Sequence, residues 1–165
     1  MDKEAILKAC NDRCPNTLME TLEISYVDVG EDYLMAKMPV GPKVHQPDGV
    51  LHGGAMVALA ESVGSAASFL FLDAKNYKVR GIEIAANHVK SIASGFVYAK
   101  ATVLHKGRTT QLWDIKIRYG NETRYHRVRC TVPQVPKIGA PIQSNILRHW
   151  PTSLYVWLRQ QKLFN

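Results

Sequence analysis

The chain has 165 residues, of which 46% are hydrophobic and 21% charged, a composition that is typical of one soluble globular domain and excludes a disordered chain. Its three cysteines are an odd number without paired spacing, which excludes a disulfide framework and favours a reducing cytoplasm. Of the net charge of +7, residues 133–165 carry +4 and the rest of the chain only +3. Such a mildly basic domain favours a phosphate-bearing small molecule over nucleic acid as its partner.

The first forty residues predict a short helix and a β-hairpin. Residues 2–10 form an amphipathic pattern typical of a short helix and show none of the regions of a signal peptide. The apolar alternation through Leu22, Ile24 and Tyr26 predicts a strand over 21–29. Gly30 and the two acids after it predict a turn, and the returning strand spans 33–40. A loop with two prolines then leads to the central segment.

The central segment predicts one long helix that is apolar on nearly every face. Gly53 and Gly54 stand at its start, and the run from 55 to 72 is long enough to raise the question of a membrane span. Glu61 and the serines at 62, 65 and 68 would be costly in lipid. We therefore expect a core helix and no stable membrane insertion.

Four further strands are predicted over 79–89, 96–105, 110–119 and 123–132, separated by short turns. Sequential strands form an antiparallel sheet, and an apolar helix must be covered, so the predicted fold class is α+β, with six strands curved around one central helix. The edges of such a sheet favour pairing with a second copy, and we expect a homodimer. The domain is predicted to span 1–132, and 133–165 is a basic, proline-containing tail to which no role is assigned.

A single acid lies within the apolar helix. At 3.6 residues per turn, Val57, Glu61, Ser65 and Ser68 share one narrow stripe, and no broad polar face surrounds it. A carboxylate in apolar surroundings has its charged form disfavoured, and in a cleft such a group is more often functional than structural. Glu61 is therefore the first candidate catalytic residue.

The loop before the helix supplies complementary groups. The backbone N–H at Gly53, at the positive end of the helix dipole, can hold a developing oxyanion, and glycine lets a carbonyl approach closely. Gln46 and His52 add polar side chains at the same end, although helix capping is an alternative role for His52. A zinc site built from His45, His52 and Glu61 is disfavoured because no paired-ligand spacing is present, so no metal or cofactor is expected.

Two basic segments follow the central helix. Asn87-His-Val-Lys90 ends a predicted strand, and His105-Lys-Gly-Arg108 forms a tight turn between two others. Basic turns are ordinarily solvated. If the two segments meet at one rim of the sheet, however, they form a phosphate site in which Arg108 binds in a bidentate manner. The other histidines, His45, His126 and His149, are interpreted as structural or surface residues.

These motifs resemble the single-domain hotdog-fold acyl-CoA thioesterases of the phenylacetic-acid-degradation type, close to the enzymes that act on hydroxybenzoyl-CoA or 1,4-dihydroxy-2-naphthoyl-CoA. The resemblance covers about residues 15–132 and is carried by four stretches, which are residues 45–55, 58–65, 83–88 and 104–108. Its specific part is the His-Gly-Gly sequence that begins at His52, with Glu61 downstream and Gln46 ahead of it.

The resemblance implies hydrolysis of a CoA thioester in homodimers or tetramers, with active sites at the dimer interface. By position, it implies that Glu61 is the catalytic carboxylate, as nucleophile or general base, and that the Gly53 N–H polarises the thioester carbonyl. Gln46 and His52 would orient the thioester, and Ser65 would place the water. The residues near the pantetheine and nucleotide of CoA would be Asn87, His88, Lys90, His105 and Arg108.

The sequence also departs from the family pattern. The family often has Asn where Ala85 stands and Arg where Lys90 stands, which predicts that the phosphates are bound more weakly or at a different position. Two alternatives stay open at this level: a hotdog dehydratase that uses His45 with Glu61, and a non-catalytic acyl-CoA-binding domain that has no use for Glu61. The acyl group is not specified, and an aryl or medium-chain acyl group is implied by resemblance alone.

Overall fold

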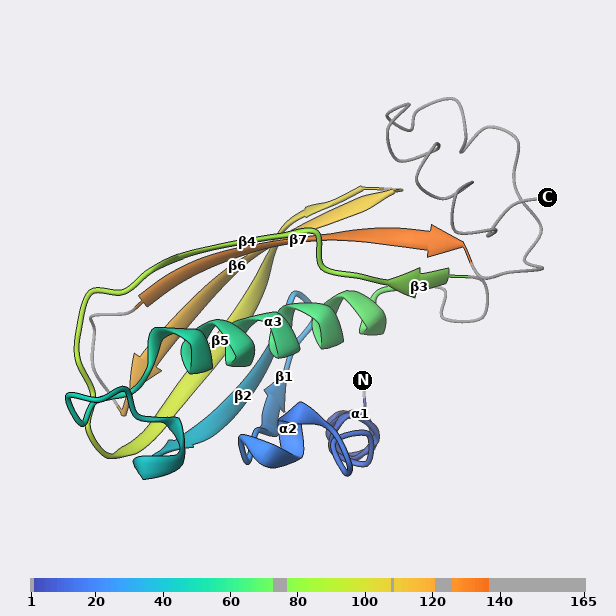
Figure 1. Cartoon of the computed structure of the whole chain (residues 1–165). Helices are drawn as coiled ribbons and strands as arrows, with labels where there is room; N and C mark the ends of the chain where they lie inside the picture. The colour runs from blue at the N-terminus through green and yellow to red at the C-terminus, as the bar shows by residue number, and fades with distance from the viewer. Residues whose placement is uncertain (1, 73–76, 108, 121–125, 137–165) are drawn as a thin grey trace.

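The computed structural model describes residues 2–72, 77–107, 109–120 and 126–136. Their elements follow in the order α1 (Lys3–Asn11), α2 (Leu18–Thr21), β1 (Ser25–Val29), β2 (Tyr33–Val40), the 3-10 helix η1 (Pro42–Val44), α3 (Gly53–Leu70), β3 (Tyr77–Val79), β4 (Glu83–Asn87), β5 (Gly95–Lys106), β6 (Thr110–Tyr119) and β7 (His126–Pro136). The long helix α3 lies along one face of a curved antiparallel sheet (Figure 1). This is the expected α+β hotdog arrangement.

The sheet has the order β1-β2-β5-β6-β7-β3, and β4 also pairs with β7. Every pairing is antiparallel. The single strand predicted over 79–89 is wrong in one respect, because residues 80–82 interrupt the strand and divide it into β3 and β4. Strand β7 continues to Pro136, so the sheet extends four residues past the predicted domain end. The rest of the predicted tail, residues 137–165, lies outside the described residues.

The first predicted strand is also shorter than expected, because the end of helix α2 and the turn that follows it occupy residues 21–24. Thr17 begins this helix, and its hydroxyl accepts a hydrogen bond from the Met19 N–H at 3.2 Å. The Glu20 carboxylate accepts from the Asn16 N–H at 2.6 Å. A threonine followed three residues later by glutamate is a known helix-start signature, and its two hydrogen bonds hold the chain in a helical turn until Leu22.

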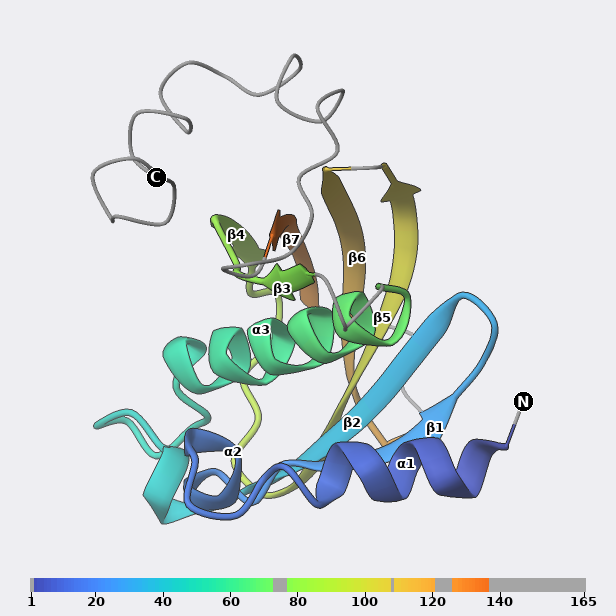
Figure 2. The ribbon, with the colours of Figure 1, turned by 90° about the vertical axis from the view of Figure 1, so that its right-hand side faces the viewer.

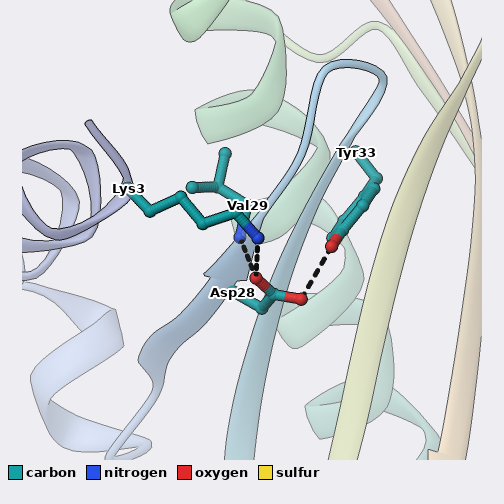
Figure 3. Close-up of polar contacts among 4 residues, drawn as sticks. All are labelled: Lys3, Asp28, Val29 and Tyr33. Atoms are coloured by element: carbon teal, nitrogen blue, oxygen red, sulfur yellow. Dashed lines mark hydrogen bonds and ion pairs between the residues drawn. The ribbon is translucent and has the colours of Figure 1, made fainter. Parts of the chain in front are cut away.

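The N-terminal helix α1 crosses the β1 edge of the sheet (Figure 2). The Asn11 side chain donates to the Tyr26 carbonyl at 3.0 Å and accepts from the Tyr26 N–H at 2.8 Å. It therefore takes the place of a neighbouring strand for these two backbone groups of the edge strand β1. At the other end of α1, the Asp28 carboxylate accepts from Lys3 at 3.1 Å and from the Tyr33 hydroxyl at 2.7 Å (Figure 3). These contacts attach α1 to the β1–β2 hairpin.

One face of α3 packs against the sheet. The buried residues of this face are Met56, Leu59, Ala60, Val63, Gly64, Ala67 and Ser68. A Cβ at Gly64 would come within 3.1 Å of Ile115 and 3.4 Å of Cys130, so glycine lets the helix approach the strands closely. By length and composition α3 could also span a membrane, but its burial against the sheet accounts for the same apolar character.

The placement of Ser68 corrects the polar stripe proposed from helical periodicity. Ser68 is fully buried, where it donates to the Gly64 carbonyl at 2.9 Å and accepts from the Trp113 indole N–H at 2.7 Å. It faces the sheet rather than a cleft. The polar face of α3 therefore consists of Glu61, Ser62 and Ser65, which are half-buried.

Candidate active site

The Glu61 carboxylate is held by donors from two different elements. The Ser65 hydroxyl, one helical turn further along α3, donates to Oε1 at 3.0 Å. The Cys130 thiol of β7 donates to Oε2 at 3.0 Å. Burial, together with this hydrogen bond and the Glu61 charge, raises the pKa of the Cys130 thiol far above its usual range, so the thiol stays protonated and remains a donor. Both oxygens are thus held in a fixed orientation.

Gly81 covers the same carboxylate from the break between β3 and β4. A Cβ at this position would overlap with Oε1 of Glu61 and would lie 2.9 Å from Cδ and 3.0 Å from Oε2. Only a residue without a side chain lets the backbone pass here while Glu61 keeps its position. Cys130 and Gly81 were both missed by sequence reasoning, because neither belongs to a motif that contains Glu61.

A pocket of about 350 Å³ contains Glu61. Its lining comes from the α1–α2 segment, β1, α3 and β3, and it is mostly apolar; the residues are Cys10, Arg13, Met19, Tyr26, Glu61, Ser62, Ser65, Ala66, Phe69, Leu70 and Val79. Glu61 and Ser65 are therefore positioned beside a cleft large enough for an organic ligand. Glu61 is thus a half-buried carboxylate at the side of an apolar cleft rather than a solvated surface acid.

His52 caps α3, which is the alternative that the sequence left open for it. Its Nδ1 accepts a hydrogen bond from the Gly54 N–H at 2.8 Å, and its ring is exposed. The Gly53 N–H is not bonded to this imidazole, and it stands at the first position of the helix. A free N–H there, at the positive end of the helix dipole, is a donor for a negatively charged or polarised oxygen.

His88 lies over the same helix start. A Cβ at Gly53 would come within 3.0 Å of His88 Nε2, so the imidazole and the Gly53 backbone are neighbours. Behind it, the His126 ring centroid lies 5.7 Å from that of His88, and His126 Nδ1 accepts from the Val89 N–H at 3.1 Å. Burial, followed by the nearby His88, lowers the pKa of His126, so this buried imidazole is held neutral. The expectation that His126 is structural is confirmed.

Gln46 and His45 belong to the loop that leads into α3. Gln46 is half-buried, and its backbone closes a turn through bonds to Val50 and Gly49. His45 Nε2 lies 3.0 Å from the Ala93 carbonyl, which gives it a structural role in the loop. His45, His52 and Glu61 do not converge on a zinc site, and no group of three possible metal ligands occurs among the described residues.

The two principal catalytic candidates are well separated within one chain. Gly53 and Glu61 are eight residues apart on the continuous helix α3, which places them about 12 Å apart along its axis. A carbonyl group that accepts from the Gly53 N–H cannot also be attacked at its carbon by a group held by Glu61 of the same chain, since attack requires about 3 Å.

The two basic segments lie at opposite ends of the sheet within one chain. Asn87, the last residue of β4, pairs with Arg127. His105 is level with Glu83, the first residue of β4, across the sheet. The register shows this, because His105 pairs with Leu112, Leu112 with Thr131, and Thr131 with Glu83. The offset between the two ends is four residues, or about 13 Å along the strands. The conditional expectation that the segments meet at one rim is therefore wrong for the single chain; Arg108 itself lies outside the described residues.

A second cavity, of about 390 Å³, lies on the opposite face of the sheet from α3. Its lining residues are Met35, Tyr98, Lys100, Thr102, Lys116, Arg118 and Gly120. On β5 the side chains at 97, 99 and 101 are buried and face α3, so those of Tyr98, Lys100 and Thr102 point the other way. Three basic side chains, Lys100, Lys116 and Arg118, therefore lie at a cavity that Glu61 does not line.

Comparison with known proteins identifies the class. Residues 48–125 match the family model of the thioesterase superfamily. The chain belongs to this superfamily and is an enzyme that hydrolyses thioesters. Membership favours hydrolysis over the dehydratase and binding-domain alternatives, in agreement with a carboxylate fixed beside an apolar pocket.

Three relatives illustrate the similarity. The chain is 44% identical over 111 residues to the proofreading thioesterase EntH of Cronobacter turicensis, a match that covers 67% of this chain and 80% of that one. It is 42% identical over 115 residues to the 1,4-dihydroxy-2-naphthoyl-CoA hydrolase of Escherichia coli, with 70% and 84% covered. A crystal structure of a mutant thioesterase from Pseudomonas aeruginosa is similar with a TM-score of 0.76 and 40% identity, covering 79% of this chain and 94% of that chain.

Proposed function

We propose that this enzyme hydrolyses an aryl- or medium-chain acyl-CoA to the free acid and CoA. The observation that carries the proposal is the Glu61 carboxylate, fixed by Ser65 and Cys130 at the side of the apolar pocket. The similarity to a naphthoyl-CoA hydrolase supports CoA as the thiol. The enzyme acts in the cytoplasm, without membrane insertion, nucleic acid or a cofactor.

Glu61 acts by one of two balanced routes. As a general base it removes a proton from water, the hydroxide attacks the thioester carbon, the C–S bond breaks, and the CoA thiolate recovers the proton. As a nucleophile, its oxygen attacks the carbon and expels the thiolate, and water then hydrolyses the anhydride. In both routes the carbonyl oxygen gains negative charge, which the Gly53 N–H and the α3 dipole stabilise. Gln46 and His52 orient the thioester, and Ser65 helps to place the water.

The separation of Gly53 from Glu61 supports an active site formed by two chains. In the homodimer that we propose, a two-fold axis relates two antiparallel α3 helices, so Gly53 of one chain faces Glu61 of the partner subunit. The outer edge of β4 is unpaired among the described strands, and pairing it with a second β4 continues the sheet. A tetramer would combine two such dimers.

The same symmetry accounts for the two distant basic segments. Antiparallel pairing of two β4 strands places the first residue of one beside the last residue of the other. The β5–β6 turn of the partner then lies on the side of the sheet where Asn87, His88 and Lys90 of the first chain lie. We propose that these residues, together with His105 and Arg108 from the second chain, bind the pantetheine and phosphates of CoA.

Thiol release from a panel of CoA thioesters tests the reaction. We expect wild-type protein to release free CoA and Glu61→Gln to lose at least about 1,000-fold in kcat, because the attacking group is removed. Glu31→Gln, which changes an exposed acid in the hairpin turn, is the matched control and should keep full activity. Absence of thiol release by wild type on every thioester refutes the proposed function, whereas an active Glu61→Gln refutes only the role of Glu61.

Mixing two inactive variants tests whether the site is shared. Gly53→Pro removes the oxyanion donor at a first helical position that tolerates proline, and Glu61→Gln removes the carboxylate. If each site combines both chains, a mixed dimer has one intact site, and an equimolar mixture recovers about a quarter of wild-type activity. If both groups act within one chain, mixing recovers nothing and the shared site is refuted.

A further inference from the structure

The pocket that contains Glu61 extends toward the C-terminal end of α3. At this end its lining includes Phe69 and Leu70 of α3 and Val79 of β3, all apolar. Such a lining favours a hydrocarbon body in the bound ligand. One charged side chain interrupts it: Arg13, from the segment between α1 and α2.

Arg13 is held at this end by an aromatic ring. Its guanidinium carbon lies 4.9 Å from the centroid of Phe69, within the range of a cation–π contact. Among the described residues no carboxylate forms an ion pair with Arg13. Phe69 therefore positions the exposed Arg13 side chain, and its planar set of N–H donors is available to a ligand in the pocket.

The helix sets the scale of the distance between this cation and the reacting end. Phe69 follows Glu61 by eight residues on α3, which separates the two backbone positions by about 12 Å along the helix axis. The approach of the attacking group takes about 3 Å of this length, and a hydrogen bond to the guanidinium takes about 3 Å more, which leaves about 6 Å for the acyl body. One benzene ring, or a chain of about five carbons, has this length.

From this geometry we propose that Arg13 determines acyl specificity, by binding an oxygen at the far end of an acyl group that has one ring between that oxygen and the thioester. A carboxylate in the para position fits best, since it accepts two parallel hydrogen bonds from a guanidinium. A 4-hydroxyl accepts a single bond and ranks second, and a 4-methyl group accepts none. The inference rests on the proposed function and names its substrate class.

The test compares three CoA thioesters, those of 4-carboxybenzoate, 4-hydroxybenzoate and 4-methylbenzoate, with benzoyl-CoA as reference. The proteins are wild type, Arg13→Met, which keeps an apolar side chain of similar length, and Lys8→Met. Lys8 is an exposed α1 residue that pairs with Asp12 and lies outside the pocket, so its substitution is the matched control. We expect Arg13→Met to reduce kcat/KM for the carboxy substrate relative to the methyl substrate by about 10-fold or more. Lys8→Met should keep the wild-type ratio, since Lys8 lies outside the pocket.

The outcomes separate the two proposals. If wild type cleaves the thioesters and Arg13→Met leaves the carboxy-to-methyl ratio unchanged, the role of Arg13 is overturned and the thioesterase assignment stands. If wild type cleaves none, the proposed function fails. The binding role of Arg13 is then tested without turnover, by calorimetric titration of wild type and Arg13→Met with terephthalate and with 4-methylbenzoate. Tighter binding of terephthalate that Arg13→Met abolishes supports the anion subsite, and equal binding of the two acids refutes it.

Discussion

Replacing Gly81 with alanine provides a specific test of the arrangement around Glu61. The added methyl group would overlap with Oε1 and would lie 2.9 Å from Cδ, so the carboxylate must rotate away. Rotation breaks the bonds from Ser65 and Cys130, each of which contributes about 1.5–3 kcal/mol as a bond to a charged group. A displacement of about 1 Å in a catalytic group lowers the rate about 100-fold, and we expect a loss of at least this size in kcat/KM for thioester hydrolysis.

The control separates this effect from destabilisation. Gly81 is exposed and its φ does not require glycine, so Gly81→Ala should unfold cooperatively within a few degrees of wild type. Gly41→Ala introduces the same methyl group where no atom lies within 4 Å and the backbone is extended, so it should change neither Tm nor activity. An active Gly81→Ala, or an inactive variant without a cooperative transition, would refute the reasoning.

Three further substitutions probe groups behind the site. Cys130→Val removes a donor to Glu61, and we expect kcat to fall about 10-fold, while Cys130→Ser retains a donor and restores kcat. Ser68→Ala leaves the buried Trp113 N–H unpaired, which should lower the free energy of unfolding in urea by about 1–3 kcal/mol without changing kcat. The pKa of His126 in the folded state lies below its ordinary value of 6.5, so the unfolded chain binds more protons. The contribution of neutral His126 to stability is therefore complete above pH 6.5 and is lost as the pH falls through the folded-state pKa. His126→Asn should therefore flatten the decline of Tm between about pH 7 and 5.

Periodicity and turn chemistry predicted the elements that depend on local sequence. The strands expected over 96–105 and 110–119 agree with β5 and β6 to within one residue, and α3 begins at Gly53, the first of the two glycines expected at its start. The missed helix α2 also had a local signal, the pairing of Thr17 with Glu20, which the apolar alternation of the next segment obscured.

The remaining differences depend on contacts between distant parts of the chain. Ser68 faces the core because Trp113, 45 residues away, donates to its hydroxyl. Cys130 contacts Glu61 only through the register of β7 in the sheet, and no spacing along the sequence encodes that register. The residues drawn from motifs were therefore accessible in advance, whereas the groups that hold Glu61 in position required the tertiary structure.

One wall of the pocket that contains Glu61 is formed by helix α1 and the segment after it, whose sequence could change independently of the sheet. Helix α1 and the segment that carries Arg13 lie outside the sheet and are attached through apolar contacts with the core, through Asn11 and through the exposed Lys3–Asp28 pair. Salt weakens such an exposed pair, and no sheet hydrogen bond depends on it. New N-terminal segments could therefore alter acyl preference without disturbing the carboxylate on α3, so this region is a natural place to exchange sequences between related thioesterases.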